Sequence, residues 1–245
     1  MFVQVGRCAY LPGRQWALAT RLAPSSDAEY RALLETCHRR SGPVAYRPVC
    51  RACAACRPIR VEAAAFRPSR SQRRSRARNL DLAVELGPLE PTAEKVALHD
   101  RFVRGRFETG EDQAFGSVEA YAACFGASPV TTIEMRYRLG ERLVAVGIVD
   151  LVPEVVSSVY FYFDPDPALA RRSLGVASVL EELGLVRSSG RRWLYLGYWV
   201  AGCATMAYKA RYRPCELLDP QGRWRPFDEV VPDAAAAGGP SDEED

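Results

Sequence analysis

Residues 132–163, TIEMRYRLGERLVAVGIVDLVPEVVSSVYFYF, contain the pattern that decides the fold. Over residues 133–139 apolar side chains alternate with charged ones, which is typical of a strand with one buried face. Residues 142–151 and 155–163 form two further apolar runs, and Gly140 predicts a tight turn before the first of them. The stretch therefore predicts an antiparallel meander.

Helical patterns on both sides of this meander indicate a mixed α/β fold. Before it, Val96, Phe102, Val103 and Phe107 recur at helical spacing. After it, we predict a helix over residues 173–188, a strand over residues 193–197 and a helix from about Ala201. The predicted parts of the chain are a Cys- and Arg-rich module over residues 1–79, an α/β (α+β) domain with a mixed sheet over residues 80–227, and a disordered acidic tail over residues 228–245.

The N-terminal module has local patterns rather than a large core. Ser26 and Glu29 have the spacing of a capping box, which predicts an amphipathic helix over residues 27–38. Residues 46–61 are irregular and rich in Pro, which predicts a hairpin and loop. Residues 69–79, SRSQRRSRARN, have almost no apolar side chain and predict a basic helix or linker.

The basic residues are unevenly distributed along the chain. There are 31 Arg and only 2 Lys, and residues 39–78 contain 12 Arg but a single acid, Glu62. Residues 227–245, in contrast, contain seven acids and no base. Genome composition can account for the total number of Arg, but it does not account for this cluster, which predicts attraction of polyanions such as RNA.

Several classes of protein are excluded by missing motifs. The sequence has no HExxH, GxSxG, GxGxxG or GxxxxGK[ST] pattern, so it predicts no zincin, hydrolase, Rossmann or P-loop site. Its apolar runs are too short for a membrane helix, and Arg7 interrupts the start before a signal peptide forms. We therefore expect a cytoplasmic protein that acts on an already activated substrate, without a membrane partner.

Cysteines at metal-ligand spacing lie within the basic segment. Cys50, Cys53 and Cys56 form a C-x2-C-x2-C run, which lets thiolates converge on one ion or cluster, and Cys8 is the best placed fourth ligand. This predicts structural or regulatory zinc or an iron-sulfur cluster, with no cofactor needed for the chemistry. The alternative is a chance group of thiols in an Ala-rich loop. The neighbouring Arg residues are expected to lower the thiol pKa values or to contact RNA phosphate.

Two further segments have patterns typical of ligand binding. Arg172 and Gly175 belong to an R-x-x-G-x-A motif at the start of the helix that follows the meander. This motif is similar to the loop that binds pyrophosphate in GNAT-type acetyltransferases. Trp199, Tyr208 and Tyr212 lie in a run of aromatic and cationic residues of the kind on which RNA bases stack. The alternative for the first segment is that Gly175 only allows close packing at the start of a helix. The alternative for the aromatic run is that its side chains are buried in the core.

Ordered motifs over about residues 7–225 resemble those of the bacterial aminoacyl-tRNA-protein transferases. The motifs are Cys8-x-Tyr10-Leu-Pro-Gly, Arg39-Arg-Ser-Gly42, Tyr46-Arg-Pro48, the Cys50 run, Pro58-x-Arg60-Val61, Ser69-Arg-Ser-Gln-Arg-Arg74, Asn79-x-Asp81-Leu82, Ser173-Leu-Gly175, Tyr195-Leu-Gly-Tyr-Trp199, Tyr208-Lys209 and Tyr212-Arg-Pro214. The resemblance implies a Cys-bearing N-terminal module attached to a GNAT-like domain. It also implies transfer of leucine from leucyl-tRNA to proteins that begin with Asp or Glu.

The sequence departs from the family pattern in two places. Phe107 follows Arg106 where the family pattern has His, so this position offers no acid or base. Thr205 stands before Met206 where the pattern has Lys. These departures leave open whether the chain uses leucine or arginine, and they favour a noncatalytic RNA-binding metal module as the alternative to an enzyme.

The reaction that the resemblance implies needs a cation for the acidic acceptor and groups to handle its amine. Candidates for the cation, all in the basic segment, are Arg39, Arg40, Arg47 and Arg60. Phosphate contact and plain solvation are the alternatives for each of them. Candidates to hold the amine, take its proton, stabilise the oxyanion or position the tRNA end are Asp150, Asp164, Tyr160, Tyr198 and Lys209. A turn role is the alternative for both Asp residues.

The function predicted from the sequence is leucylation of acidic protein N-termini, which marks proteins for degradation. Arginyl transfer by the same fold is the nearest alternative. The predicted partners are leucyl-tRNA and proteins with an N-terminal Asp or Glu, and DNA is not among them. An N-acetyltransferase that uses acetyl-CoA is supported by residues 172–177 alone, and the basic Cys module argues against it.

Overall fold

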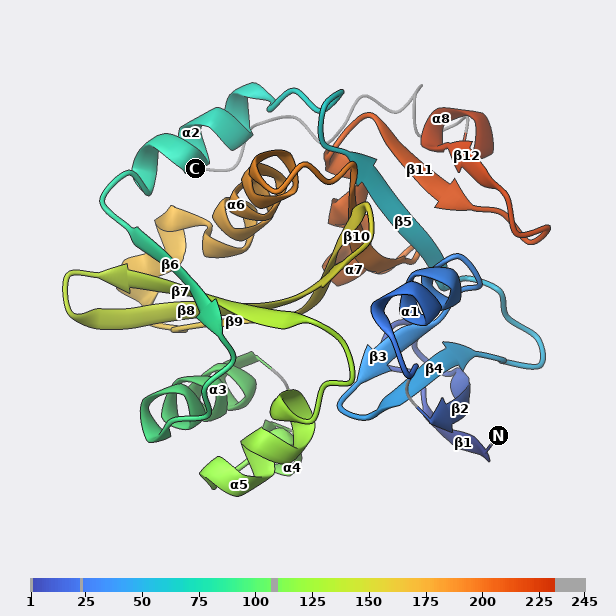
Figure 1. Cartoon of the computed structure of the whole chain (residues 1–245), viewed down its shortest axis with the longest axis horizontal. Helices are drawn as coiled ribbons and strands as arrows, with labels where there is room; N and C mark the ends of the chain where they lie inside the picture. Colours follow the sequence, from blue (N-terminus) through green and yellow to red (C-terminus); the bar gives the residue numbers. More distant parts are fainter. Residues whose placement is uncertain (1, 23, 107–109, 232–245) are drawn as a thin grey trace.

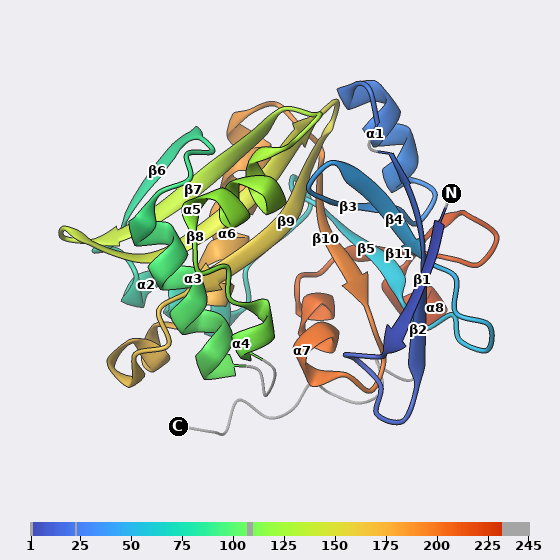
Figure 2. The same ribbon diagram turned by 90° about the horizontal axis from the view of Figure 1, so that it is seen from below.

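The computed structural model describes residues 2–22, 24–106 and 110–231 and has two β-sheets (Figures 1 and 2). The smaller sheet has the strand order β1-β2-β4-β3. Its strands are β1 Phe2–Arg7, β2 Gln15–Leu22, β3 Arg39–Ser41 and β4 Val44–Pro48. Each neighbouring pair in this sheet is antiparallel.

The larger sheet has the strand order β12-β11-β5-β10-β9-β8-β7-β6. Its strands are β5 Arg57–Glu62, β6 Ala83–Pro88, β7 Thr132–Leu139, β8 Arg142–Val152, β9 Val155–Phe163, β10 Trp193–Trp199, β11 Cys215–Leu218 and β12 Trp224–Pro226. Only the β9–β10 pair is parallel, and its neighbours are antiparallel. The prediction of an α/β fold with a mixed sheet is therefore confirmed.

Helices cover both faces of the larger sheet (Figure 1). On one face lie α2 Arg70–Arg78 and α6 Leu174–Ser188, and on the other lie α3 Ala93–Arg106, α4 Gly110–Gln113 and α5 Val118–Tyr121. The shorter helical segments are η1 Ala122–Gly126, η2 Pro167–Arg172, α7 Ala204–Ala207, η3 Tyr208–Arg211 and α8 Phe227–Val230, and α1 Asp27–Leu34 lies beside the smaller sheet. None of the helices in the described ranges is long and apolar enough to cross a membrane.

The predicted meander forms β7, β8 and β9. Thr132 pairs with Asp150, and Ala145 pairs with Phe163. The β7–β8 and β8–β9 pairs each contain one register shift. Strand β8 is buried from Leu143 to Asp150 because helices pack on both of its faces. This continuous burial explains why its sequence is an uninterrupted apolar run rather than an alternating one.

Residues on either side of position 80 belong to the same sheet. Strand β5 pairs with β10, joining Arg60 to Tyr195, although it lies within the predicted N-terminal module. The hairpin predicted over residues 46–61 is therefore wrong, because its two strands, β4 and β5, lie in different sheets. The boundary predicted at residue 80 has no counterpart in this strand order.

Both N-terminal helices begin at the predicted caps. Ser26 accepts a hydrogen bond from the Glu29 amide at 3.1 Å, but α1 ends at Leu34 rather than residue 38. Cys37, with φ 65°, follows in a left-handed conformation that no helix continues. Residues 70–78 form the predicted basic helix, and Ser69 caps it with a complete capping box.

Other elements differ from the predictions in their lengths. The helix predicted from the spacing of Val96, Phe102 and Val103 is confirmed as α3. The helix predicted over residues 173–188 and the strand predicted from Trp193 are confirmed as α6 and β10. The helix predicted from about Ala201 consists of two short pieces, α7 and η3, while β6, β11 and β12 have no counterpart in the predictions. Asp228 lies in α8, inside the predicted disordered tail, and residues 232–245 and Phe107 lie outside the described residues.

Candidate active site

The two central strands of the larger sheet separate partway along their length. Strands β9 and β10 pair only where Trp193–Tyr195 face Val155–Ser157. A bulge between Tyr195 and Tyr198 interrupts the pairing of β10 with β5, and Gly197 there has φ 81°. The strands then diverge toward α7, as Figure 2 shows. Backbone and side chains of both strands thereby face an open space.

A cavity of about 680 Å³ occupies this divergence, within the range typical of small-molecule sites. Its apolar lining includes Phe102, Val159, Phe161, Leu174, Leu196 and Met206. Its polar lining includes Arg39, Ser158, Tyr160, Glu182, Tyr198 and Lys209. We call this space the central cavity.

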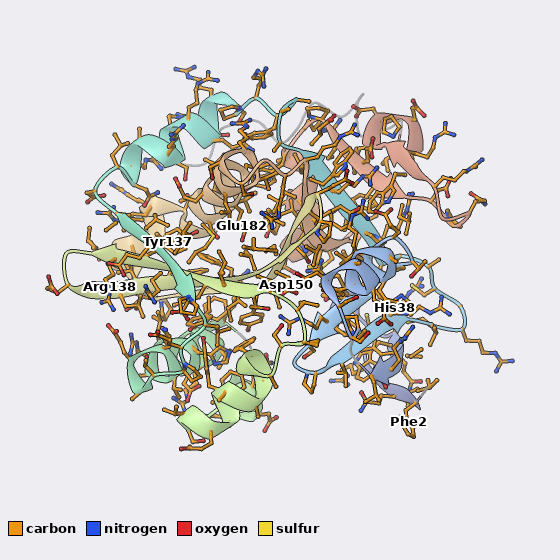
Figure 3. The ribbon with its side chains drawn as sticks, viewed as in Figure 1. Phe2, His38, Tyr137, Arg138, Asp150 and Glu182 are labelled. Carbon is orange, nitrogen blue, oxygen red and sulfur yellow. The ribbon has the colours of Figure 1, made fainter. Side chains whose placement is uncertain are left out.

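Glu182 on α6 is the buried carboxylate of the central cavity, and Figure 3 labels it beneath that helix. Its side chain is 1% exposed, Oε1 accepts a hydrogen bond from Ser158 Oγ at 3.2 Å, and Oε2 has no partner among the described atoms. Burial raises the pKa of Glu182 to about 7, against the opposing effects of Ser158, Arg39, Ser178 and Lys209. The sequence predictions missed this residue. The available signal was an acid on the apolar face of a helix, four residues after Ser178.

Lys209 faces the same cavity from η3. Its Nζ donates to the Tyr198 carbonyl at 2.9 Å. Burial and the Arg39 charge lower the pKa of Lys209 to about 7. The Tyr198 hydroxyl donates to the Cys37 carbonyl at 2.9 Å, and burial raises the pKa of Tyr198 well above its usual value. Burial likewise raises the pKa of Tyr160 to about 12, so both phenols are hydrogen-bond donors rather than bases.

Arg39 brings a positive charge from the smaller sheet into the central cavity. Its NH1 donates to Ser157 Oγ at 3.1 Å, and NH2 donates to the Ser158 carbonyl. The guanidinium lies close to Gly197, where a Cβ would be 3.7 Å from it. It forms no ion pair with any carboxylate in the described ranges, so it is a cation held in place by hydrogen bonds to β9.

The R-x-x-G-x-A segment contributes to the cavity only in part. Gly175 lines the cavity, and open space surrounds the position that its Cβ would take. Arg172 instead forms an ion pair with Asp81, with 2.7 Å between NH1 and Oδ1. Of the two residues predicted to bind substrate in this segment, Gly175 therefore faces the central cavity, whereas the Arg172 side chain is paired with Asp81.

Asp150 and Asp164 do not have the free carboxylates that an amine-binding role requires. Asp150 is fully buried against Arg40 on the side of β8 that faces α1 and β3 (Figure 3). Asp164 lines the cavity but pairs with Arg142 at 2.9 Å and Arg101 at 3.3 Å. Burial opposes ionisation of Asp164, but these bonds hold its pKa below the usual value. Glu182, rather than either Asp, is the carboxylate available to a substrate.

Three other predicted site residues are occupied by internal contacts. The Arg60 Cζ lies 3.8 Å from the centroid of the Trp193 ring and 4.3 Å from that of the Trp224 ring. Arg60 also forms an ion pair with Glu216. Trp199 and Tyr212 are buried in the main core. Tyr208, in contrast, lines the central cavity and is 36% exposed, so it is the member of the aromatic run that can contact a ligand.

The four predicted metal ligands line a second cavity, of about 900 Å³, which shares Tyr10, Tyr46 and Tyr198 with the first. Its lining includes Cys8, Cys50, Cys53, Cys56 and Arg47. The amides of Leu11 and Ala17 donate to the Cys8 and Cys50 sulfurs at 3.4 Å and 3.3 Å. Within the described ranges, however, no three such side chains are arranged to hold an ion. Burial and the neighbouring thiols raise the pKa of Cys56 to about 12, which corrects the predicted lowering.

Comparisons with known proteins match both halves of the chain to one family. Residues 6–74 match the model for the N terminus of arginine-tRNA-protein transferase, and residues 94–219 match the model for its C terminus. An aspartate/glutamate leucyltransferase of Halorhodospira halophila is 39% identical over 89% of this chain and 92% of that protein. One from Gluconacetobacter diazotrophicus is 37% identical over 90% of this chain and 85% of that protein.

Solved structures give weaker likenesses. The structure of L-PGS from Bacillus licheniformis has a TM-score of 0.46 at 13% identity, covering 70% of this chain and 58% of that one. The ribosomal-protein-S18-alanine N-acetyltransferase from Escherichia coli has a TM-score of 0.37 at 18% identity, covering 52% and 76%. The assignment therefore depends on the sequence matches, and by these the chain belongs to the arginine-tRNA-protein transferase family.

Proposed function

We propose that this protein transfers leucine from leucyl-tRNA to the α-amino group of proteins that begin with Asp or Glu. The relatives named above are aspartate/glutamate leucyltransferases, and their matches extend over both the smaller sheet and the central cavity. The reaction takes place where charged tRNA is available, so we place it in the cytoplasm.

One observation carries the proposal: Arg39 is a fixed cation at the central cavity without an ion-pair partner in the described parts of the chain. An N-terminal Asp or Glu has a side-chain carboxylate only a few bonds from its α-amine. A guanidinium is suited to bind that carboxylate through charge-assisted hydrogen bonds. Arg40 and Arg60 are occupied by Asp150 and Glu216, and Arg47 faces the other cavity, so Arg39 is our candidate for acid recognition.

The remaining lining of the cavity supports leucine as the transferred residue. Phe102, Val159, Phe161 and Leu174 are apolar and offer a leucyl side chain burial from water. An arginyl side chain would need a carboxylate partner against this apolar lining. Asp164 and Asp166 are already paired with arginines, which leaves, among the described lining residues, Glu182, the carboxylate that the acceptor amine also needs. This contrast favours leucyl transfer over arginyl transfer.

A basic helix beside the cavity supports tRNA as the donor. Five exposed arginines of α2 form no ion pair with a described carboxylate: Arg70, Arg73, Arg74, Arg76 and Arg78. Asn79 Nδ2, at the end of this helix, donates at 2.7 Å to the Arg172 carbonyl, which directly precedes the Ser173 that lines the cavity. A duplex whose phosphates lie along α2 could thus place its single-stranded end in the cavity.

The chemistry requires no further activation. Aminoacyl-tRNA is an ester, so attack by an amine is favourable without ATP. The pKa of an α-amino group is about 7.7–8.0, so about 10–20% of acceptors are already neutral at pH 7. Alignment of ester and amine in one cavity supplies much of the acceleration, since effective molarities can be worth about 7–11 kcal/mol.

A purified reaction tests the proposal. An Asp-initiated peptide is incubated with the protein, total tRNA, synthetases and labelled leucine or arginine, with an acetyl-Met peptide as the blank. Label from leucine alone is the expected result. Label from arginine alone would establish the arginyl alternative, and label from neither would favour a noncatalytic RNA-binding module.

A further inference from the structure

We infer that Glu182 is the general base that accepts the proton of the attacking α-amine, and that Ser158 orients it. This inference rests on the proposed function and names the residue that removes the proton in that reaction. Neither residue belongs to any of the motifs by which the chain resembles its family.

The geometry of Glu182 is unusual for a structural carboxylate. Glu182 is almost fully buried, yet it pairs with no Arg or Lys, and one of its oxygens has no partner within the described residues. Leaving a buried polar atom unsatisfied is destabilising, because the atom loses its hydrogen bonds to water and gains none in return. Such a cost is commonly retained at functional sites, where a ligand supplies the missing partner. An ammonium or amine N–H is the donor that fits Oε2.

The two charged ends of an acidic N-terminus match two groups of the central cavity. Arg39 and Glu182 both line it, and their charges interact. An acceptor whose side-chain carboxylate pairs with Arg39 has its α-amine only a few bonds away, inside the same cavity that Glu182 lines. A substrate without the acid would not be held in this orientation.

The proton balance of the step is complete without a further reactant. The neutral amine nitrogen forms a bond to the ester carbonyl carbon, and the nitrogen loses one proton to Glu182. When the bond from that carbon to the ribose oxygen breaks, Glu182 returns the proton to this oxygen. The products are an amide and a free tRNA hydroxyl, and Glu182 is again ionised.

The surroundings give Glu182 suitable proton affinity. A base operates best with a pKa near the working pH, and burial brings the pKa of Glu182 to about 7. The charged and titratable groups that face it are Arg39 from β3, Tyr137 from β7, Lys209 and Tyr208 from η3, and Tyr212. Of these, Lys209 also titrates near pH 7, so variants must separate the two groups.

The test compares four variants with the wild type under single-turnover conditions with leucyl-tRNA and an Asp-initiated peptide, from pH 5.5 to 9. E182Q keeps the shape of the side chain but cannot accept a proton, and E181Q is the matched control, because Glu181 does not line the cavity. We expect E182Q to lower the rate constant about 10²–10⁴-fold and to lose the rise with pH near 7, while the later rise near pH 8, which comes from the acceptor amine itself, remains. The Km for the peptide and the binding of tRNA should change little, and E181Q should behave as the wild type.

S158A supplies an independent readout. The Ser158 hydrogen bond lowers the pKa of Glu182, so its removal should move the same rise to higher pH. A K209M variant should retain that rise if Glu182 is its source. Wild-type rate and pH profile in folded E182Q would overturn the inference while leaving the proposed function intact. Absence of leucyl transfer by the wild type would instead overturn the proposed function.

Discussion

Arg40 of β3 and Asp150 of β8 form a buried ion pair that joins the smaller sheet to the larger one. Arg40 Nε lies 3.0 Å from Asp150 Oδ2, NH2 lies 2.6 Å from Oδ1, and both side chains are at most 1% exposed. Thr132 Oγ1 also donates to Oδ1, at 2.6 Å. The pair satisfies a carboxylate that would otherwise be buried alone, and so it holds β3 and the adjacent Arg39 in place.

Breaking this pair should destabilise the fold. D150N or R40M leaves one member without its charged partner in a site that water cannot reach. We expect each change to lower the free energy of unfolding by about 3–5 kcal/mol. Urea unfolding followed by circular dichroism measures this value. The exposed R47A is the control and should change it by less than about 0.5 kcal/mol, and an equal loss in both variants and control would contradict the structural role.

Replacing Arg39 should reduce the preference for acidic N-termini. R39A removes the cation that we assign to the acceptor carboxylate, and R39K restores only part of the two-pronged contact. The ratio of kcat/KM for an Asp-initiated peptide to that for an Asn-initiated peptide should fall roughly 10–100-fold in R39A. An unchanged ratio, whatever the loss of overall rate, would show that Arg39 acts only in holding Ser157 and Ser158.

The basic face of α2 should determine the affinity for tRNA. R73E with R74E removes two candidate phosphate contacts, so the Km for leucyl-tRNA should rise and the peptide Km should not. The slope of log affinity against log salt concentration should fall by about 2. R7E, on the exposed β1 strand, is the control for a general change of charge. The assignment of α2 would be refuted by an effect of R7E as large as that of either α2 substitution.

The stability of the protein should depend on pH through Glu182. Because burial raises the pKa of Glu182 to about 7 from a usual 4.5, the folded state keeps this proton at pH values where the unfolded state has lost it. Its contribution to the free energy of unfolding is therefore full below about pH 4.5 and is lost as the pH rises toward 7. Thermal melts should show E182Q gaining stability relative to wild type over this window, and E181Q showing no such trend.

Binding of zinc or an iron-sulfur cluster by the cysteines of the second cavity remains a prediction. Elemental analysis of protein purified without chelator, together with its visible absorbance, distinguishes zinc from an iron-sulfur cluster. We expect one of these, and C53S should reduce its content. Metal-free protein that folds and transfers leucine would show that the thiols have a structural or redox role only.

The local elements that the sequence predicted correctly have a local physical cause. Alternation over residues 133–139 defines a strand because every second side chain must face the core, and Ser69 with Gln72 defines the start of α2 because their side chains bond its free amides. The motifs that resemble those of the transferase family lie along the chain in a fixed order, so they can also be recognised from the sequence alone.

The identity of the site residues depended on tertiary structure. Nothing local distinguishes Arg39 from Arg40, yet neighbouring strand residues point to opposite sides, so one faces the cavity and the other faces Asp150. Nothing local distinguishes Asp150 from Glu182 either. Asp150 is paired because the fold brings Arg40 beside it, whereas no cation in the described ranges forms an ion pair with Glu182. Sequence alone determined the elements and the family, whereas the divergence of β9 from β10 and the pairing of charges across the two sheets were decided only when distant segments packed together.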